Sequence, residues 1–532
     1  MRLALAQTNN VVGDIDGNAA RTVELIDAAR RADADLVLLP ELMVTGYPAE
    51  DLFLRPGFVR AARRAVHEIA ASTHGIVALV GAPLYEDGAL YNACFVVAGG
   101  EVRDVYRKHH LPNYGVFDED RYFEPGNDRV LVDVAGVRVG LTVCEDIWIP
   151  GPPASELGAA GAQLVANISA SPFHVGKDRE REEIVRRCAR ANGAPVALCN
   201  AIGGQDELIF DGHSVVIAPD GEVLARAAGF EEDLLVVSWP ELRGPVAAEH
   251  SDLEQMRLAL ELGVHDYVEK NGFGDVVVSV SGGIDSALTA ALCTEALGPE
   301  RVHTVTMPSR YSSAGTRGDA ERLAESLGVE FREIPIEPIV EAFEAALAAS
   351  FTGRESDLTE ENLQARVRGT LLMALSNKFG WLVIASGNKS ELSVGYSTLY
   401  GDLAGGFALI KDVYKTDVFR LCRHLNERAG RDLIPASIIE RAPSAELRAD
   451  QLDEDSLPPY PALDRVLEAY VEQDRSREEL VADGFDADVV DRALGMIDRA
   501  EYKRRQAPPG VKLHPKAFGR DRRTPITNRW PG

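Results

Sequence analysis

Residues 276–292, VVVSVSGGIDSALTAAL, constrain what this chain can fold into more than any other stretch. Residues 276–280 are mostly β-branched and apolar, which predicts a short buried strand. The Ser-Gly-Gly at 281–283 interrupts that pattern, and apolar side chains return at helical spacing over 287–292. A strand, a small polar turn and a helix in this order are typical of a parallel sheet that binds ligands at its carboxyl edge.

The turn has the properties of a phosphate site. Backbone N–H groups converge at a helix start, the helix dipole adds partial positive charge, and two glycines let the backbone approach an anion. Asp285 can hold a magnesium ion that the same phosphate shares. A Walker A loop is excluded, because its Gly-Lys-Ser/Thr sequence is absent. The turn therefore favours pyrophosphate as a leaving group, although a purely structural turn would share its composition.

Four motifs in the second half resemble known enzymes. SGGIDS at 281–286 resembles the signature of the ATP pyrophosphatases, which activate a carboxylate or a carbonyl as an adenylate. ENLQAR at 361–366, SGNKSE at 386–391 and GYSTLYGD at 395–402 are similar to the synthetase domain of NAD synthetases. The resemblance runs from about residue 251 to the C-terminus. It implies Mg²⁺ as cofactor, ATP and deamido-NAD as substrates, and a homo-oligomer.

The resemblance also implies roles for individual residues. Asp285 and Glu391 would hold magnesium, although Glu391 at a helix start would equally complement the helix dipole. Asn362, Glu391 and Lys503 would contact deamido-NAD. Leu399 stands where ammonia-dependent relatives carry a lysine, so one substrate contact has no counterpart. The implied ATP site comprises Ser279, Val280, Ser281, Gly282, Gly283, Ile284, Asp285, Ser286, Ser386, Lys415 and Ser437.

Both halves of the chain alternate short apolar runs with helical segments. In the first half, candidate strands fall at 3–6, 36–39, 76–80, 94–97, 137–143, 164–167, 194–200 and 214–218, and helices at 19–32, 58–72 and 178–191. This order predicts an α/β, layered α-β-β-α sandwich, with Gly81 and Gly88 at turns near strand ends. In the second half, strands at 276–280, 302–307 and 382–385 alternate with helices, which predicts a doubly wound, Rossmann-like parallel sheet.

Three reactive side chains of the first half, Glu41, Lys108 and Cys144, fall at or just beyond strand ends. A cysteine thiolate beside an ammonium, with a glutamate to take its proton, has the parts for attack on an amide carbonyl. Each residue alone would also fit a structural role. Their flanks resemble the nitrilase superfamily: LLPEL at 38–42, YRKHHLP at 106–112 and GLTVCEDIW at 140–148. That resemblance implies Glu41 as general base, Lys108 as oxyanion support and Cys144 as nucleophile.

Glutamine is the substrate that the resemblance implies for the first half. Tyr114, Ser171 and Lys177 match positions that hold glutamine in the glutaminase domain of NAD synthetases. A phenol and a hydroxyl suit the polar groups of an amino acid. Glu119 would either orient Lys108 or lie on the surface as an ordinary acid.

Composition sets the remaining expectations. A chain of 532 residues is too long for one ordinary core, so we expect two domains. Pro240, Gly244 and Pro245 mark a connector between them, which gives the bounds 1–245 and 246–532. A net charge of −27 argues against binding to nucleic acid or anionic membrane. The six scattered cysteines form no metal or disulfide pattern, and the start lacks a targeting segment, so a cytoplasmic location is expected.

On charge alone, the basic stretch 502–523 would be a solvated tail, whereas the resemblance suggests a segment closing over an anionic substrate.

Taken together, the two resemblances imply amidation of deamido-NAD to NAD, using ATP and ammonia released from glutamine. The implied route passes through an adenylate and releases AMP and pyrophosphate. One rival is an amidotransferase with another carboxylate as acceptor, against which the motifs at 361–366 and 386–391 argue. The other is a simple amidase whose second domain senses nucleotide without turnover, against which Asp285 with Glu391 argues.

Overall fold

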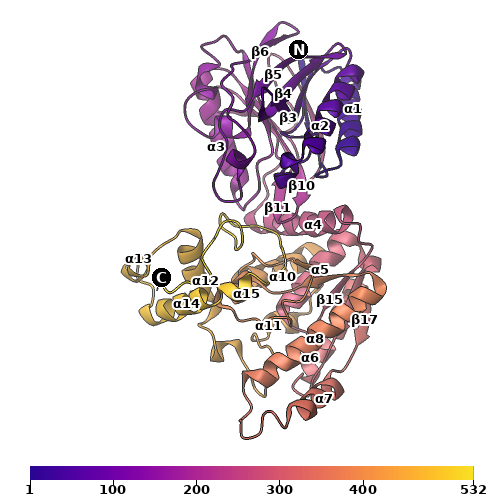
Figure 1. Cartoon of the computed structure of the whole chain (residues 1–532), viewed down its shortest axis with the longest axis vertical. Coiled ribbons are helices and arrows are strands. Elements are labelled where there is room, and N and C mark those ends of the chain that lie inside the picture. Colours follow the sequence, from indigo (N-terminus) through magenta and orange to yellow (C-terminus); the bar gives the residue numbers. More distant parts are fainter. Residues whose placement is uncertain (531–532) are drawn as a thin grey trace. The chain divides into compact units, whose positions relative to one another are not determined.

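The computed structural model describes residues 1–530 and shows two compact units, the first Met1–His250 and the second beginning at Ser251 (Figure 1). The first unit contains two six-stranded sheets, and the second contains a five-stranded sheet. Each unit has hydrophobic clusters of its own, as expected for separate domains.

The first unit is a sandwich of two sheets. Its helices are α1 (Ile15–Arg31), α2 (Pro56–Ser72) and α3 (Lys177–Asn192). Its strands are β1 (Arg2–Gln7), β2 (Leu36–Leu38), β3 (Val77–Glu86), β4 (Ala89–Ala98), β5 (Glu101–Arg107), β6 (Leu131–Val134), β7 (Val137–Val143), β8 (Leu164–Ser169), β9 (Val196–Asn200), β10 (Ile202–Gln205), β11 (Leu208–Asp211), β12 (Val215–Ile217), β13 (Val223–Arg226) and β14 (Asp233–Ser238). The sheets have the orders β14-β1-β2-β3-β4-β5 and β13-β12-β9-β8-β7-β6, and β10 and β11 form a separate hairpin.

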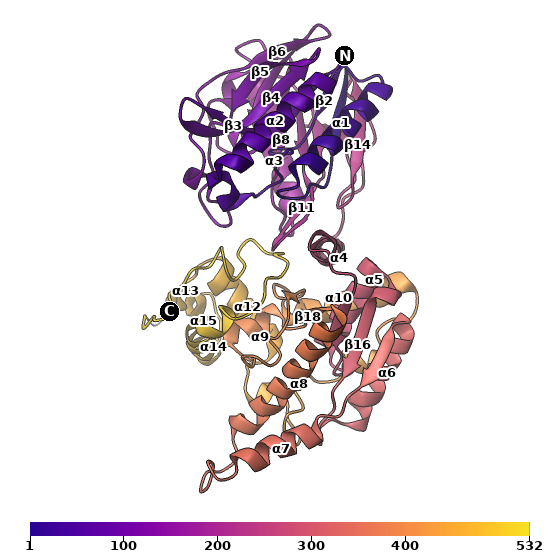
Figure 2. The same cartoon turned by 45° about the vertical axis from the view of Figure 1, so that its right-hand side comes forward.

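Four layers result from how these elements bury their apolar faces. Leu5 from one sheet and Leu141 from the other belong to the same buried cluster, so the main core lies between the sheets. Helices α1 and α2 cover the outer face of the first sheet (Figure 2), and Ile26 of α1 and Val66 of α2 belong to the buried cluster on that face. Val185 of α3 covers the second sheet. The predicted α-β-β-α arrangement is confirmed.

Gly81 differs from its predicted position at a turn, because it lies inside β3. A Cβ atom there would meet the backbone nitrogen of Leu42 and the carbonyl oxygen of Pro40, each at 2.4 Å. The glycine therefore allows the segment that carries Glu41 to pack directly against the strand. Gly88 lies at the turn between β3 and β4, as predicted.

The second unit is built on a five-stranded parallel sheet of order β17-β16-β15-β18-β19. Its strands are β15 (Val276–Ser279), β16 (Val302–Thr306), β17 (Glu330–Glu333), β18 (Leu382–Ala385) and β19 (Phe407–Ala408). Its helices are α4 (Asp252–Lys270), α5 (Ile284–Leu297), α6 (Ala314–Leu327), α7 (Glu337–Leu347), α8 (Leu358–Phe379), α9 (Lys389–Val394), α10 (Lys415–Ala429), α11 (Ala436–Glu440), α12 (Tyr460–Leu467), α13 (Arg477–Ala482), α14 (Ala487–Arg499) and α15 (Glu501–Arg504).

The strand order reverses at β15, which makes the sheet doubly wound as predicted. Val340 of α7 and Val367 of α8 pack with Val277 and Val383 on one face of the sheet. Since β15 and β18 are parallel neighbours, the segments that follow them emerge side by side at the carboxyl edge. Helices α12 to α14 form a further hydrophobic cluster.

The basic stretch near the C-terminus is ordered against the second unit. Asp412 accepts hydrogen bonds from the backbone N–H groups of Leu513 and His514, both at 2.8 Å. Lys512 is 6% exposed and donates to Asp521 at 2.6 Å. The interpretation as a solvated tail is therefore wrong for this part of the stretch.

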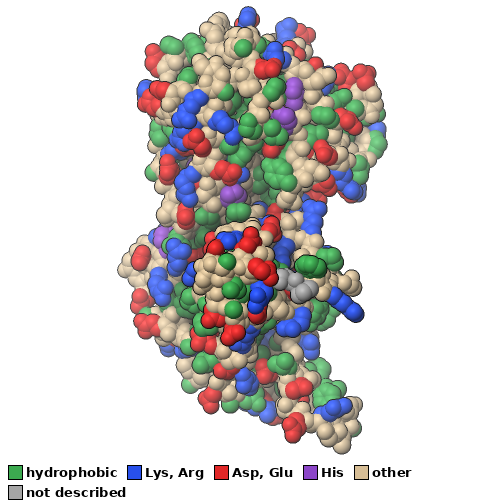
Figure 3. Space-filling model, turned by 90° about the vertical axis from the view of Figure 1, so that its left-hand side faces the viewer, with side chains coloured by type: hydrophobic (Ala, Val, Ile, Leu, Met, Phe, Trp, Pro, Cys, Tyr) green, Lys and Arg blue, Asp and Glu red, His purple; other side chains and the backbone are tan. Residues whose placement is uncertain are grey.

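The surface drawn in Figure 3 mixes acidic and basic side chains, with no broad basic area on that face. This agrees with the acidic composition of the chain. Within residues 1–530, no helix combines the length and the apolar character needed to cross a bilayer.

Candidate active sites

Glu41, Lys108 and Glu119 form a buried ion cluster in the first unit. Lys108 Nζ donates to Glu41 Oε1 at 2.7 Å and to the two carboxylate oxygens of Glu119 at 2.9 and 3.0 Å. None of the three residues is more than 3% exposed. Glu119 is thus an interior partner of Lys108, and its interpretation as a surface acid is wrong.

The Glu41 carboxylate is held in one orientation by two further donors. Asn92 Nδ2, from β4, donates to Oε1 at 2.7 Å, and the backbone N–H of Ala170 donates to Oε2 at 2.9 Å. Both oxygens are therefore engaged, which fixes the direction in which the carboxylate can take a proton.

Cys144 directly follows β7 and begins a short 3₁₀ turn, Cys144–Ile147. Its φ of +40° lies in the left-handed region, which is strained for a residue with a Cβ. Burial raises the pKa of the Cys144 thiol, and the charge of Glu41 raises it further against the opposing charge of Lys108. The Cys144 side chain therefore rests as a thiol, and nucleophilic attack by it would require transfer of its proton to a base.

The charge of Lys108 persists in this buried position. Burial alone would lower the pKa of Lys108, but Glu119 and Glu41 outweigh that effect and raise it well above its usual value. Burial raises the pKa of Glu119 to about 7, although the Lys108 ammonium opposes the shift. An ammonium held between two carboxylates suits stabilisation of an oxyanion.

The three residues predicted to bind glutamine contact or adjoin the segments that carry Cys144 and the Ala170 N–H. The Tyr114 hydroxyl donates to Glu145 Oε1 at 3.1 Å, and Glu145 directly follows Cys144. Ser171 is buried and follows Ala170, whose N–H binds Glu41. Lys177 lies over the Trp148 ring, 3.9 Å from its centroid, and burial lowers the pKa of Lys177.

The second site begins at the turn after β15. Gly282 has a φ of +82°, and a Cβ there would lie 2.2 Å from the Thr316 carbonyl oxygen, so only glycine fits. Gly283 precedes α5 without a side-chain cap, which leaves N–H groups of the first turn available to an anion. The Ser281 hydroxyl accepts from the Gly283 N–H at 3.2 Å, and the Ser286 hydroxyl donates to the Gly283 carbonyl at 3.0 Å.

Asp285 and Glu391 meet at a shared ammonium group beside this turn. Lys415 Nζ forms an ion pair with Asp285 and donates to Glu391 Oε1 at 3.0 Å. Asn388 Nδ2 donates to Asp285 Oδ1 at 2.8 Å, and its Oδ1 accepts the N–H of Glu391 at 2.9 Å. Burial raises the pKa of Glu391 to about 8; Lys415 opposes the shift and the Asp285 charge adds to it.

This donor set fits magnesium bound together with a nucleotide rather than magnesium alone. Within residues 1–530, no group of three or more acidic, histidine or cysteine side chains could enclose a metal ion. Mg²⁺, however, commonly takes one or two carboxylates and fills its remaining positions with phosphate oxygens and water. Asp285 and Glu391 supply those two carboxylates.

The remaining residues of the predicted ATP site lie around the turn at different depths. Ser386 follows β18, whose register places it beside the end of β15. Ser437 lies on α11 and donates to Asp319 at 2.5 Å, while Arg441 contacts Asp319 and donates to the Gly282 carbonyl at 3.3 Å. Ser437 thus reaches the turn through Asp319 and Arg441. Ser279 ends β15, Val280 is buried and Ile284 begins α5.

The residues predicted to bind the dinucleotide separate into two places. Asn362 accepts a hydrogen bond from Thr398 at 2.7 Å, and Lys503 Nζ donates to the carbonyls of Gly395 and Ser397, both at 2.7 Å. Both therefore contact the stretch 395–402, whereas Glu391 points to Lys415 as described above. Two cavities border the stretch. One, of about 840 Å³, includes Lys503 and Gly395 in its lining.

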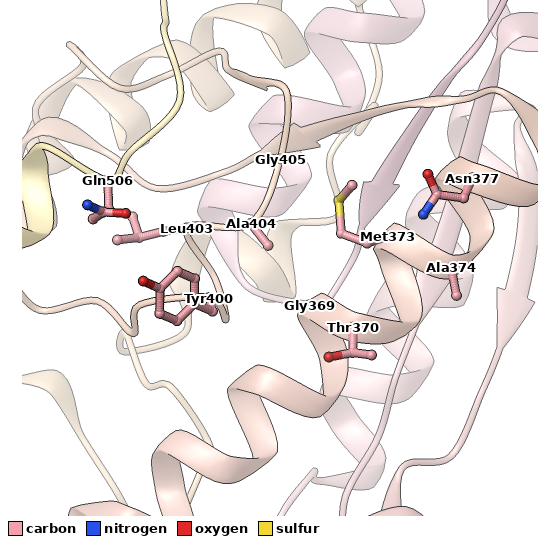
Figure 4. Close-up of a pocket in the computed structure, with 10 residues that line it drawn as sticks. All are labelled: Gly369, Thr370, Met373, Ala374, Asn377, Tyr400, Leu403, Ala404, Gly405 and Gln506. Carbon is pink, nitrogen blue, oxygen red and sulfur yellow. The ribbon is translucent and has the colours of Figure 1, made fainter.

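The other cavity, of about 580 Å³, lies between α8 and residues 400–405. In Figure 4 the side chains of Tyr400 and Met373 flank it. Gly369 of α8 allows the close approach, because a Cβ there would be 2.7 Å from the Tyr400 carbonyl oxygen. Both cavities fall within the usual size range of small-molecule sites.

Several side chains at these sites were not predicted from the sequence. Asn92 and Asn388 orient Glu41 and Asp285, and Arg441 donates to the Gly282 carbonyl in the turn after β15. A lone polar residue in the apolar run 89–98 was a usable signal for Asn92. No local pattern marks Arg441, which comes from a segment far along the chain.

Comparison with known proteins assigns both halves. The carbon-nitrogen hydrolase family matches residues 2–246, and the NAD synthase family matches residues 257–507. A glutamine-dependent NAD(+) synthetase of Thermotoga maritima is 45% identical, covering 100% of this chain and 99% of that protein. One of Xylella fastidiosa is 47% identical at the same coverage. The solved structure of an Acinetobacter baumannii glutamine-dependent NAD+ synthetase in complex with ADP is 42% identical, with a TM-score of 0.81 over 99% of this chain and 98% of that one.

Proposed function

The chain belongs to the family of glutamine-dependent NAD(+) synthetases, and we propose that residues 1–245 release ammonia from glutamine while residues 246–532 use it to amidate deamido-NAD. The observation that carries this proposal is the presence of two separate sites in one chain. Glu41, Lys108 and Cys144 supply amide hydrolysis, while Asp285 and Lys415 lie beside a turn that suits phosphate.

In the first site, Glu41 takes the proton of the Cys144 thiol as sulfur attacks the side-chain carbonyl carbon of glutamine. Lys108 stabilises the oxyanion that forms. The protonated Glu41 then gives its proton to the departing nitrogen, the C–N bond breaks, and ammonia leaves a thioester on the cysteine. Glu41 next activates water, which releases glutamate and restores the thiol. Tyr114, Ser171 and Lys177 would hold the amino-acid end of glutamine.

In the second site, the carboxylate of deamido-NAD attacks the α-phosphorus of ATP and pyrophosphate leaves. Ammonia then attacks the activated carbonyl carbon, the attacking nitrogen loses one proton to water, and the C–O bond to AMP breaks to leave the carboxamide. The N–H groups at the start of α5, which have no side-chain cap, and the Lys415 ammonium beside Asp285 would bind phosphate oxygens. Asn362 and Lys503 would position the dinucleotide through the stretch 395–402.

Asp285 and Glu391 would hold Mg²⁺ on the ATP phosphates. When bound, the ion supplies charge neutralisation to the pyrophosphate leaving group. Glu391 must lose its proton to serve as a ligand, because its pKa is raised to about 8.

The need for a free thiol bears on location and assembly. All six cysteines are unpaired and buried, and a cytoplasmic environment would keep the Cys144 thiol reduced. We therefore propose a cytoplasmic enzyme, and a homo-oligomer as the resemblance implies. Light scattering of the purified chain tests the oligomeric state.

Isotope transfer tests the proposed adenylate. Deamido-NAD labelled with ¹⁸O in its nicotinate carboxylate is converted with ATP, magnesium and ammonium, and the AMP is analysed by mass spectrometry. An adenylate route moves one labelled oxygen into AMP. Label in pyrophosphate, or unlabelled AMP, would refute the route while leaving the overall amidation untouched.

A further inference from the structure

Asp146 is a fully buried carboxylate that the proposed glutaminase chemistry does not use. It lies two residues after the nucleophile, in the 3₁₀ turn Cys144–Ile147, and it is 0% exposed. A carboxylate in such a position is costly unless its oxygens accept hydrogen bonds. The identity of its donors shows what it does.

Four donors converge on the Asp146 carboxylate. Oδ2 accepts the Tyr106 hydroxyl at 2.7 Å and the backbone N–H of Val143 at 2.9 Å. Oδ1 accepts the backbone N–H groups of His109 at 3.1 Å and His110 at 2.9 Å. All four lone-pair sites of the carboxylate are used, and all four donors are uncharged.

These donors bracket two of the three proposed catalytic residues. Tyr106 and the two histidines flank Lys108 on both sides, and Val143 immediately precedes Cys144. The segments come from different strands, since Tyr106 lies in β5 and Val143 ends β7. A single carboxylate therefore ties the chain that carries the ammonium to the turn that carries the sulfur.

The hydrogen bonds to Asp146 include one from the residue just before Cys144, where the backbone is strained. Cys144 has a φ of +40°, and the hydrogen bond that the Val143 N–H donates to Asp146 closes the turn around it. A strained residue keeps its conformation only when its surroundings hold it there. The stacking of Tyr106 on His109, with ring centroids 5.4 Å apart, stiffens the other side of the tie.

We propose that Asp146 is a positioning residue that holds Cys144 and Lys108 in register for attack on the glutamine amide. The inference rests on the proposed function of Cys144 as nucleophile. Asp146 touches neither substrate nor sulfur in this role. It sets the geometry in which the Lys108 ammonium meets the oxyanion that Cys144 creates.

Asp146→Asn is the sharpest test, because it preserves size and removes one acceptor oxygen. Whichever way the amide turns, an NH₂ group faces either the Tyr106 and Val143 donors or the two histidine N–H groups. We expect the turnover number for glutamine hydrolysis to fall about 100-fold, as for a small misplacement of reacting groups. The KM for glutamine should change less than about threefold, because a positioning residue that does not contact glutamine affects kcat rather than substrate binding. Ammonium-dependent NAD formation should stay within about twofold of wild type, because the second unit is untouched.

A second readout concerns the thiol itself. The rate of Cys144 alkylation by iodoacetamide, followed against pH by peptide mass spectrometry, should change its profile in Asp146→Asn, because the sulfur moves relative to Glu41 and Lys108. Tyr106→Phe removes one donor of the four and should give the same changes at a smaller size. It also serves if Asp146→Asn does not fold. Asp35→Asn is the matched control, since Asp35 accepts a backbone N–H from Arg2 at 2.7 Å in the same unit; it should leave both readouts unchanged.

Three results would overturn the inference: glutamine turnover within about threefold of wild type in Asp146→Asn, a loss confined to KM, or an equal loss with ammonium. Cys144→Ala distinguishes this failure from failure of the proposed function. If Cys144→Ala abolishes glutamine use and Asp146→Asn does not, only the positioning role is wrong. If Cys144→Ala retains glutamine use, the proposed nucleophile is wrong.

Discussion

Removal of the buried Lys108 ammonium should destabilise the first unit in a way that a second substitution partly reverses. Lys108→Met keeps the length of the side chain but leaves Glu41 and Glu119 facing each other with no cation. Loss of one member of a buried ion cluster typically costs about 3–5 kcal/mol. We expect a decrease of that size in the free energy of unfolding at pH 8.

The cost should depend on pH with a defined sign. Burial and the neighbouring Glu41 charge already raise the pKa of Glu119 in the folded state, and loss of the opposing Lys108 ammonium raises it further above its unfolded value. Carboxyls with raised folded pKa values favour folding at low pH, and this contribution is lost as the pH rises through the folded values. The destabilisation by Lys108→Met should therefore be smaller at pH 5.5 than at pH 8.

A double-mutant cycle with Glu119→Gln isolates the charge effect. Glu119→Gln removes one unpaired negative charge, so the double variant should be less destabilised than the sum of the single variants by about 1–3 kcal/mol. Glutamine-dependent activity should stay at least about 100-fold below wild type in the double variant, because the oxyanion support is still missing. Restored stability without restored activity separates the structural role of Lys108 from the chemical one.

Unfolding of the first unit is best followed by pulsed hydrogen exchange of peptides from residues 1–250 during urea titration, so that the second unit does not contribute. Arg243→Met is the matched control, because Arg243 forms an exposed ion pair with Glu222. It should leave the unfolding free energy unchanged within error. Additive effects of Lys108→Met and Glu119→Gln on the free energy of unfolding would refute the reasoning. Equal destabilisation by Lys108→Met at pH 5.5 and pH 8 would refute it as well.

Three further predictions concern substrate binding. Binding of magnesium-ATP near pH 7 should release about one proton, because Glu391, with a pKa of about 8, must ionise to bind the metal. Calorimetry in buffers of different ionisation enthalpy should detect this proton release in wild type and not in Glu391→Gln. The affinity for magnesium-ATP should also rise as the pH is raised towards 8. Gly282→Ala should abolish NAD formation from either nitrogen source in a coupled assay, because the added Cβ would collide with backbone, while glutamine hydrolysis should persist. Gly353→Ala is the control, since Gly353 has a φ of +79° but no atom near its Cβ position, and its rate of NAD formation should stay near wild type. Tyr114→Phe loses the hydrogen bond to Glu145 and should raise the KM for glutamine up to about tenfold, with ammonium kinetics unchanged in steady-state assays.

Local sequence patterns predicted the strands well where several consecutive apolar residues are buried. The strand at 137–143 and the strand at 382–385 have the bounds that their apolar runs indicate. Gly81 was misplaced because a glycine needed for close approach reads in the sequence like a glycine at a turn. The short strands β10 and β13 were missed, since a four-residue strand next to turns carries little periodicity.

The sequence predicted the reactive residues of the candidate sites, but it did not predict the side chains that hydrogen-bond to those residues and orient them. Cys144 and Lys108 stand at strand ends within distinctive flanks, so chemistry and position coincide in the sequence. Asn92 is 51 residues from the Glu41 it orients, and Arg441 is 159 residues from the Gly282 carbonyl it contacts. Such partners depend on tertiary packing, which no local spacing encodes. The pKa of the Cys144 thiol likewise depends on burial, and burial outweighs the neighbouring ammonium.

The division of labour between the two sites is tested most directly by NAD formation from deamido-NAD, ATP and magnesium, comparing wild type with Cys144→Ala, each supplied with glutamine or ammonium. We predict that the variant forms no NAD with glutamine and retains wild-type rates with ammonium. NAD formation by the variant from glutamine would contradict the assignment of the nucleophile. Failure of wild type to form NAD from either nitrogen source would contradict the proposed function as a whole.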